Sequence, residues 1–216
     1  MSLGTGWERW PLLWLVPSPG DDVASLSAPE RCWSEALPPL RRRRYRHSRA
    51  ALRQVLAGVL RCPPAAVPLH SPPGEPPRLE GQSGWISLSH GGEALLIGYS
   101  PEPIGVDLEP VGRPLDGAGL MRRFFPGPEQ AQLERMGGEN LRDAVLTSWV
   151  LKEAAIKWRQ RTLAAELSLW CYDHLSGHLH HQGDGAQPEC RWGVLESWRW
   201  AVVGPGARRA VLERWP

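Results

Sequence analysis

The sequence is poor in lysine: among its 25 lysine and arginine residues, only Lys152 and Lys157 are lysines. Long apolar runs are also missing, and none approaches the roughly 18–20 residues that cross a bilayer. The apolar stretch over 11–16 is too short for a signal peptide and precedes no small-residue cleavage site. We therefore expect a cytoplasmic protein that does not bind membranes.

Cysteine is scarce as well, and its four residues form no CxxC pair. This usage is typical of a compartment in which thiols stay reduced. Several of the remaining zinc-type ligands gather near the C-terminus, but their spacing matches no common zinc module. We expect them to lie in strands and turns; they are Cys171, His174, His178, His180, His181 and Cys190.

The chain has 216 residues, of which 42% are hydrophobic, and a formal net charge of only +2. Such a composition excludes a disordered or fibrous chain and indicates one large or two small globular domains. The basic residues are concentrated over 41–61, a segment without aspartate or glutamate. Because no aromatic platform accompanies them, we expect this helix to meet a small anion or an acidic protein and not nucleic acid.

Periodicity predicts alternating helices and strands. In the N-terminal part, we expect a strand over 7–16, a helix over 41–61 and strands over 85–89 and 93–99. In the C-terminal part, we expect a strand over 104–109, a loop over 113–119, helices over 129–136 and 139–161, and strands over 167–173, 177–181 and 192–203. Both parts run from helix to strands, with a border near 100–103, which hints at a duplicated α+β unit.

The strongest constellation of charged residues consists of Asp107, Glu109, Glu153 and Lys157. Asp107 and Glu109 are two residues apart on a predicted strand, so both point to the same face. Glu153 and Lys157 are four residues apart and share one face of a predicted helix. Three carboxylates suit Mg²⁺, and a lysine beside them could bind the phosphates of a substrate. The pattern predicts a metal-assisted phosphoryl transfer.

Each of these pairs also has a plain structural interpretation. Two acids on a strand often face solvent, and an i, i+4 glutamate–lysine pair is commonly a surface salt bridge worth about 0.3–0.5 kcal/mol. The amino-acid sequences of the surrounding segments favour the functional interpretation.

Four segments resemble the signatures of the 4′-phosphopantetheinyl transferases, in the same order and at similar spacing. They are Ser-Leu-Ser-His over 87–90, Pro-Ile-Gly-Val-Asp-Leu-Glu over 103–109, Phe-Phe-Pro-Gly-Pro-Glu over 124–129, and Trp-Val-Leu-Lys-Glu-Ala-Ala-Ile-Lys over 149–157. The chain length suits the Sfp type of this family. That resemblance implies an α+β fold in which two similar halves, 1–102 and 103–216, form a pseudo-dimer within one chain.

The resemblance also implies an activity and its site. These enzymes transfer the phosphopantetheine arm of coenzyme A to a serine of an apo acyl or peptidyl carrier protein, and release adenosine 3′,5′-bisphosphate. Asp107, Glu109 and Glu153 match the family's Mg²⁺ ligands. Glu153 is also the implied general base, directly or through a metal-bound water. Lys157 matches the lysine that contacts the coenzyme's phosphates.

Further residues match positions that contact the nucleotide. Ser89 and His90 belong to the SHS-like segment, and His90 matches a residue near the 3′-phosphate. Arg49 falls where the family often places a basic residue for that phosphate.

The chain departs from the family at two positions. Glu75 stands where a lysine often holds coenzyme A, so either Arg78 substitutes or this side of the pocket is weaker. Gly91 replaces the second serine of the SHS-like segment, which we expect to leave a flexible backbone amide near the phosphates.

Other functions use the same features. A Mg²⁺-dependent nuclease or nucleotide hydrolase would need the same carboxylates but no protein acceptor. A non-catalytic RNA-binding module would depend on the arginine helix, and its affinity would fall with salt. A degenerate relative would bind coenzyme A without turnover. Since two halves can enclose a site between them, we expect a monomer.

Overall fold

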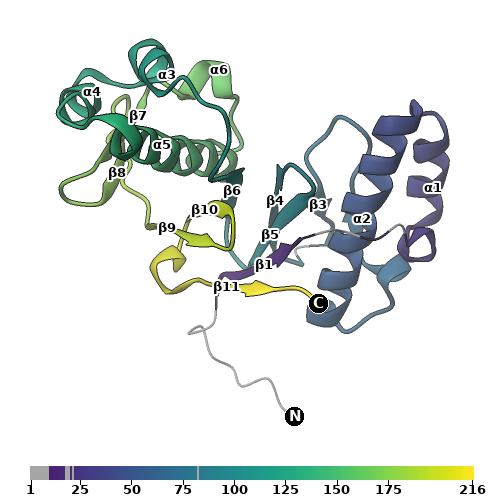
Figure 1. Cartoon of the computed structure of the whole chain (residues 1–216). Coiled ribbons are helices and arrows are strands. Elements are labelled where there is room, and N and C mark those ends of the chain that lie inside the picture. Colours follow the sequence, from purple (N-terminus) through teal and green to yellow (C-terminus); the bar gives the residue numbers. More distant parts are fainter. Residues whose placement is uncertain (1–9, 18–19, 21, 82) are drawn as a thin grey trace.

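The computed structural model describes residues 10–17, 20, 22–81 and 83–216. The fold mixes helices and β-sheets, as the sequence predicts. Figure 1 shows a group of strands at the centre, with one long helix on each side of it. These helices are α2 (Pro39–Leu60) and α5 (Gly138–Trp158).

The larger sheet has four strands in the order β11-β1-β5-β4. These strands are β1 (Leu12–Val16), β4 (Trp85–Gly91), β5 (Ala94–Ser100) and β11 (Val211–Arg214). β4 and β5 form an antiparallel hairpin, and β1 pairs antiparallel with β5. β11 comes from the far end of the chain and pairs parallel with β1, with Leu12 opposite Val211. The sheet therefore joins the first and last strands of the fold.

A second, antiparallel sheet has the order β6-β10-β9. Its strands are β6 (Gly105–Pro110), β9 (Cys190–Leu195) and β10 (Trp198–Val203). Two small pairs complete the strands: β2 (Leu69–His70) with β3 (Arg78–Leu79), and β7 (Trp170–Asp173) with β8 (His178–His181).

The shorter helices are α1 (Ala28–Glu35), α3 (Gly117–Phe124), α4 (Gly127–Leu133) and α6 (Leu163–Glu166). Single 3₁₀ turns lie at Val23–Ser25, Pro64–Ala66 and Ala207–Arg209. α1 starts with a capping box, in which Ser27 and Glu30 satisfy each other's backbone amides.

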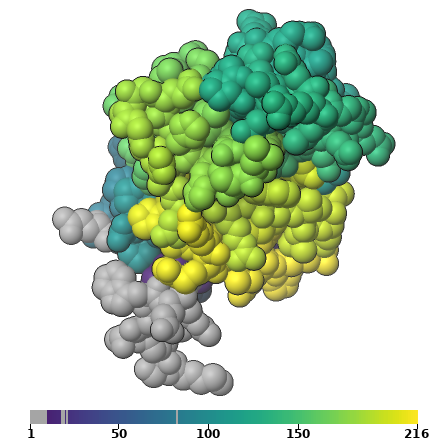
Figure 2. Space-filling view, turned by 90° about the vertical axis from the view of Figure 1, so that its left-hand side faces the viewer, coloured from purple at the N-terminus to yellow at the C-terminus, as the bar shows by residue number. Residues whose placement is uncertain are grey.

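The two sheets pack face to face. Leu13 and Leu15 of β1 share a buried cluster with Val106 and Leu108 of β6 and Val202 of β10. The opposite face of the larger sheet is covered by Leu52, Val55 and Leu56, among other residues of α2. On the far side of the smaller sheet, α5 buries Val150, Leu151, Ala154 and Ala155 against β7, β8 and β10. The resulting order of layers is helix, sheet, sheet, helix. The face of the molecule seen in Figure 2 is formed mainly by the second half of the sequence, coloured from teal to yellow.

Several predicted elements need correction. The strand predicted over 7–16 is confirmed over Leu12–Val16, and 7–9 lie outside the described residues. The loop predicted over 113–119 is wrong at its end, because Asp116 caps α3 there by accepting a hydrogen bond from the Gly119 amide. The single strand predicted over 192–203 is two strands, since Glu196 turns the chain with a φ of 55°. Helix α1 and strand β11 were not predicted.

Among the described residues, no helix combines the length and the apolar character needed to cross a membrane.

Candidate active site

Strand β6 and helix α5 bring together the three acids that the sequence singled out. One carboxylate oxygen from each of Asp107, Glu109 and Glu153 lies within 4.8 Å of the other two. Within the described part of the chain, this is the only group of at least three histidine, cysteine or acidic residues so arranged. The two acids that share one face of the strand therefore lie beside the glutamate on the helix, as their spacing in the sequence predicts.

Gly105 explains why the helix comes so close to the strand. A Cβ at this position would lie 1.9 Å from the carbonyl oxygen of Ala154 and 2.4 Å from the backbone nitrogen of Trp158. Because glycine has no side chain, the backbones of β6 and α5 can contact each other directly. Glu153 and Lys157 belong to the same stretch of α5, so this contact sets their distance from Asp107.

Asp107 is almost completely buried, with 2% of its surface exposed. Its Oδ1 accepts hydrogen bonds from the Ser89 hydroxyl at 2.6 Å and from Lys157 Nζ at 2.7 Å. Its Oδ2 is buried without a hydrogen-bond partner among the described residues. A buried, unpartnered oxygen in a group of three carboxylates fits a hard divalent cation such as Mg²⁺.

Glu109 is held by Arg113, whose Nη1 donates to its Oε1. Burial, together with the charge of Asp107, raises the pKa of the Glu109 carboxyl, and Arg113 opposes the rise. The Arg113 guanidinium also lies 5.8 Å from the centre of the Trp149 ring. Arg113 was not expected from the sequence, because an i, i+4 relation to an acid is informative on a helix, whereas Glu109 lies on a strand and Arg113 in the loop after it.

Glu153 is half-buried beside two other acids. Burial and the charge of Asp107 raise the pKa of the Glu153 carboxyl to about 7, although Lys157 lowers it. Lys157 Nζ lies 4.0 Å from Glu153 Oε2 and also donates to the Ser89 hydroxyl at 3.0 Å. The lysine thus connects Ser89, Asp107 and Glu153.

The second lysine has a different environment. Lys152 is fully buried and lies 2.6 Å from Glu129 Oε2. Its ammonium is 3.7 Å from the centre of the Phe125 ring. Since Glu129 also accepts a hydrogen bond from the Tyr172 amide, this ion pair ties α5 to α4 and β7 and does not face the carboxylate site.

A cavity of about 690 Å³ opens beside the carboxylate site. That volume lies in the range of cofactor pockets. Its wall combines five basic or imidazole side chains with apolar ones. The first group is Arg49, Arg78, His90, Lys157 and Arg161; the second includes Pro76, Pro77, Trp85, Ile86, Ile104 and Trp158. Glu75 lines the same wall as Arg78.

Arg49 is buried in α2, with its guanidinium 5.1 Å from the centre of the Tyr45 ring. Its Nε has no hydrogen-bond partner among the described residues. A buried arginine with an unused donor at a cavity wall suits an anionic ligand.

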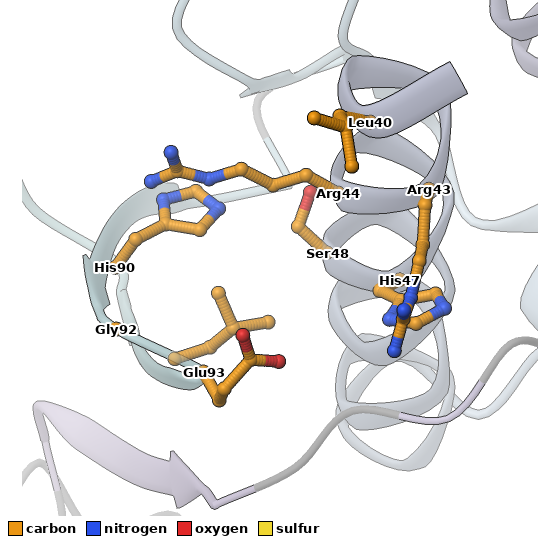
Figure 3. Close-up of a pocket in the computed structure, with 9 residues that line it drawn as sticks. Leu40, Arg43, Arg44, His47, Ser48, His90, Gly92 and Glu93 are labelled. Atoms are coloured by element: carbon orange, nitrogen blue, oxygen red, sulfur yellow. The ribbon is translucent and has the colours of Figure 1, made fainter.

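His90 separates this cavity from a smaller one of about 280 Å³ and lines both. Figure 3 shows the smaller cavity between α2 and the end of β4, with Arg44 beside the His90 ring. Burial, then the charges of Arg44, Arg49 and Lys157, lower the pKa of His90 to about 4. His90 is therefore neutral near pH 7 in the ligand-free protein.

Gly91 is not the flexible amide that we expected. It is a buried residue of β4, paired with Ala94 across the hairpin. A Cβ on Gly91 would lie 2.9 Å from Cζ3 of the Trp198 ring and 3.1 Å from a methyl group of Leu108. The position has no room for a side chain.

The zinc-type ligands near the C-terminus form no metal group in the described part of the chain. His181 lies between two acids, with Nε2 3.1 Å from Glu166 and Nδ1 2.8 Å from Asp184. His174 shares a hydrogen bond of 2.9 Å with the Ser148 hydroxyl. These histidines connect loops and strands, as expected.

Comparisons with known proteins identify the family of this chain. The model of the 4′-phosphopantetheinyl transferase superfamily matches residues 103–202, which include all three carboxylates and Lys157. The protein slr0495 of Synechocystis sp., whose name assigns it to the 4′-phosphopantetheinyl transferases, is 32% identical over 197 residues, covering 82% of this chain and 80% of that protein. The 4′-phosphopantetheinyl transferase ffp of Bacillus subtilis is 30% identical over 98 residues, or 45% of this chain and 41% of that protein. The chain belongs to the 4′-phosphopantetheinyl transferase superfamily and is an enzyme of this type.

Proposed function

We propose that this enzyme transfers the 4′-phosphopantetheine group of coenzyme A to a serine of an apo acyl or peptidyl carrier protein. The observation that supports this most directly is the convergence of Asp107, Glu109 and Glu153 beside Lys157, at the edge of a cavity lined with basic residues. Coenzyme A has a pyrophosphate and a 3′-phosphate, so a pocket for it needs several cations.

The proposed reaction breaks one P–O bond and forms another. The serine oxygen of the carrier attacks the β-phosphorus of coenzyme A, and the bond from that phosphorus to the bridging oxygen breaks. Adenosine 3′,5′-bisphosphate leaves with the bridging oxygen and its electron pair. Glu153 accepts the serine proton, and Lys157 compensates charge on the phosphate oxygens.

Asp107, Glu109 and Glu153 would hold Mg²⁺, chiefly through the unpartnered Oδ2 of Asp107. When bound, Mg²⁺ supplies charge neutralisation and polarisation at the pyrophosphate. Ser89 and Lys157 keep Asp107 in place through its other oxygen. That division leaves one oxygen of Asp107 for the metal.

The nucleotide would occupy the basic cavity. Arg49 and His90 are our proposed contacts for the 3′-phosphate, and Arg78 replaces the lysine that the family often has near Glu75. Arg43 and Arg44 line the smaller cavity on the other side of His90 and add positive charge close to the same phosphate.

We further propose that residues 1–102 and 103–216 are the two α+β halves of a pseudo-dimer that works as a cytoplasmic monomer, without nucleic acid or membrane partners. Each half has one long helix against an antiparallel hairpin. The site supports this view, since Ser89 comes from one half and Asp107 and Lys157 from the other.

Intact-protein mass spectrometry of apo carrier proteins tests the proposal. Each carrier is incubated with the enzyme, coenzyme A and Mg²⁺, and we expect a gain of one phosphopantetheine per carrier. The gain should disappear with EDTA, with a serine-to-alanine carrier and with Glu153→Gln. Glu134→Gln, at the exposed residue that follows α4, is the matched control and should remain active.

Other outcomes would contradict the proposal. Cleavage of coenzyme A or nucleotides without a modified carrier would indicate a hydrolase. Salt-sensitive RNA binding that ignores Glu153→Gln, without transfer, would indicate a binding module. Binding of coenzyme A without transfer to any carrier would indicate a protein that has lost turnover.

A further inference from the structure

Trp198 of β10 lies directly over the end of β4. Built onto Gly91, a Cβ would come within 2.9 Å of Cζ3 and 3.0 Å of Cε3 of the indole, and at Gly92 it would lie 3.4 Å from Cη2. The ring also packs against the buried cluster that contains Leu108. Figure 3 shows where this strand end lies opposite α2, with His90 on β4 and Gly92 on the turn that follows it.

This contact joins the two strands that bear the site. Ser89 and His90 come immediately before Gly91 on β4, and Ser89 donates its hydrogen bond to Asp107. Trp198 pairs with Pro110, the residue after Glu109 on β6. The indole therefore connects the end of the strand with Ser89 and His90 to the end of the strand with Asp107 and Glu109.

We propose that Trp198 is a positioning residue for coenzyme A binding: it packs on the backbone of Gly91 and so fixes the end of β4, where Ser89 bonds Asp107 and His90 lines the cavity. This inference rests on the proposed function, because the ligand it serves is coenzyme A. It predicts that an atom added at Gly91 displaces β4, and that the loss appears mainly in the affinity for coenzyme A. A misplacement of about 1 Å at such a site can change rates by roughly 10²-fold.

The chain offers a matched control for this contact. Gly193 of β9 lies under Trp200 of β10 in the same way, since a Cβ there would be 2.9 Å from Cζ2 of that ring. β9 is the strand of this sheet farthest from β6. Gly193→Ala thus creates a comparable clash between glycine and tryptophan without touching Ser89, His90 or the carboxylates.

The experiment compares Gly91→Ala, Gly193→Ala, Trp198→Leu and the double variant Gly91→Ala/Trp198→Leu. For each, we measure Tm, the KM for coenzyme A, the KM for the carrier and kcat. Gly91→Ala is expected to raise the KM for coenzyme A about 10-fold or more, with little change in the carrier KM. Gly193→Ala should lower Tm to a similar extent and leave the KM for coenzyme A within about 2-fold. In the Trp198→Leu background, Gly91→Ala should change this KM several-fold less, because the clashing ring atoms are gone.

Three results would overturn the inference: an unchanged KM in Gly91→Ala, an equal rise in Gly193→Ala, or the same rise with and without Trp198. If Gly91→Ala does not fold, Trp198→Leu against Trp200→Leu tests the contact without an added atom, and only Trp198→Leu should raise the KM for coenzyme A. Failure of the proposed function is distinguishable, because the unchanged protein would then transfer nothing. Transfer by the unchanged protein with equal KM values in all variants would overturn this inference alone.

Discussion

Lys157 Nζ lies 2.7 Å from Asp107 Oδ1, and this ion pair connects the last turn of α5 to the middle of β6. Asp107 is buried, whereas a third of the Lys157 side chain is exposed toward the cavity. The lysine can therefore hold the aspartate with one hydrogen and offer another to a bound phosphate. Replacing Lys157 would therefore remove a contact from both Asp107 and the phosphate.

Lys157→Met should lower kcat/KM by roughly 10²–10³-fold, as expected for a lost donor to charge that develops in a transition state. Lys157→Arg should recover little of this, because a planar guanidinium does not replace a compact ammonium between Ser89 and Asp107. Steady-state transfer assays with varied coenzyme A give the measurement. Near-normal activity of Lys157→Met would remove the lysine from the mechanism.

Glu153→Gln should stabilise the metal-free protein at pH 8 while abolishing transfer. The folded pKa of Glu153 is about 7, above its ordinary value of 4.5, so the folded state binds more protons between these values. The stability that this group contributes is complete below pH 4.5 and is lost as the pH rises through 7. Because glutamine does not ionise, Glu153→Gln does not lose this stability, and its free energy of unfolding at pH 8 should be higher by about 1–3 kcal/mol.

Urea unfolding in EDTA at pH 4.5 and pH 8 checks this prediction. The gain should be present at pH 8 and absent at pH 4.5, and Mg²⁺ should reduce it by stabilising the unchanged protein. Glu134→Gln serves again as the exposed control. An equal effect of Glu153→Gln at both pH values would show that carboxylate repulsion is not its source.

His90 should make the free protein less stable as the pH falls from 6.5 toward 4. Its folded pKa of about 4 lies below the ordinary value of 6.5, so the unfolded state binds more protons in this window. Stability therefore rises with pH there, by about 1–3 kcal/mol across the window after allowance for solvent screening. His90→Gln should flatten the part of the pH dependence that comes from this group. The check is the free energy of unfolding, measured with urea between pH 4.5 and pH 7.5. If it changed with pH equally in the unchanged protein and in His90→Gln, the prediction would be wrong.

Lys152 and Glu129 should behave as a structural pair. Lys152→Met alone leaves the Glu129 charge buried and is expected to cost about 3–5 kcal/mol of stability. The double variant Lys152→Met/Glu129→Gln should lose less than the sum of the single variants, since no buried charge remains. Thermal unfolding of the unchanged protein, the two single variants and the double variant gives the coupling free energy between Lys152 and Glu129. If the stability losses of the single variants simply added up in the double variant, the ion pair would not be the source of the effect.

The two lysines illustrate what sequence reasoning can and cannot predict. Lys157 was assigned by its i, i+4 relation to Glu153, which the helix preserves. Lys152 lies five residues earlier, about 140° around the helix, and points into the cluster of Phe125 and Glu129. The helical periodicity of this segment does not show which neighbouring elements pack on each face, so it did not distinguish the buried Lys152 from Lys157 at the site.

Local spacing therefore predicted the carboxylates and most strands well, because i, i+2 and i, i+4 relations survive folding. Relations between distant segments were not predictable in this way. The approach of α5 to Gly105, the contact of Trp198 with Gly91 and the pairing of β11 with β1 all depend on how the sheets and helices pack. Arg113 was missed because a single charge in a loop gives no periodic signal.

The parallel pairing of β1 with β11 also bears on how the protein is made. The hairpin of β4 and β5 and helix α2 are synthesised early, and β1 can join them at once. Position 12 must nevertheless wait for position 211, so one edge of the first sheet stays open while most of the chain is translated. An unpaired strand edge invites pairing with other chains. Other chains can therefore pair with this edge while the polypeptide is still on the ribosome, and slow translation or late chaperone contact should lower the yield of folded enzyme.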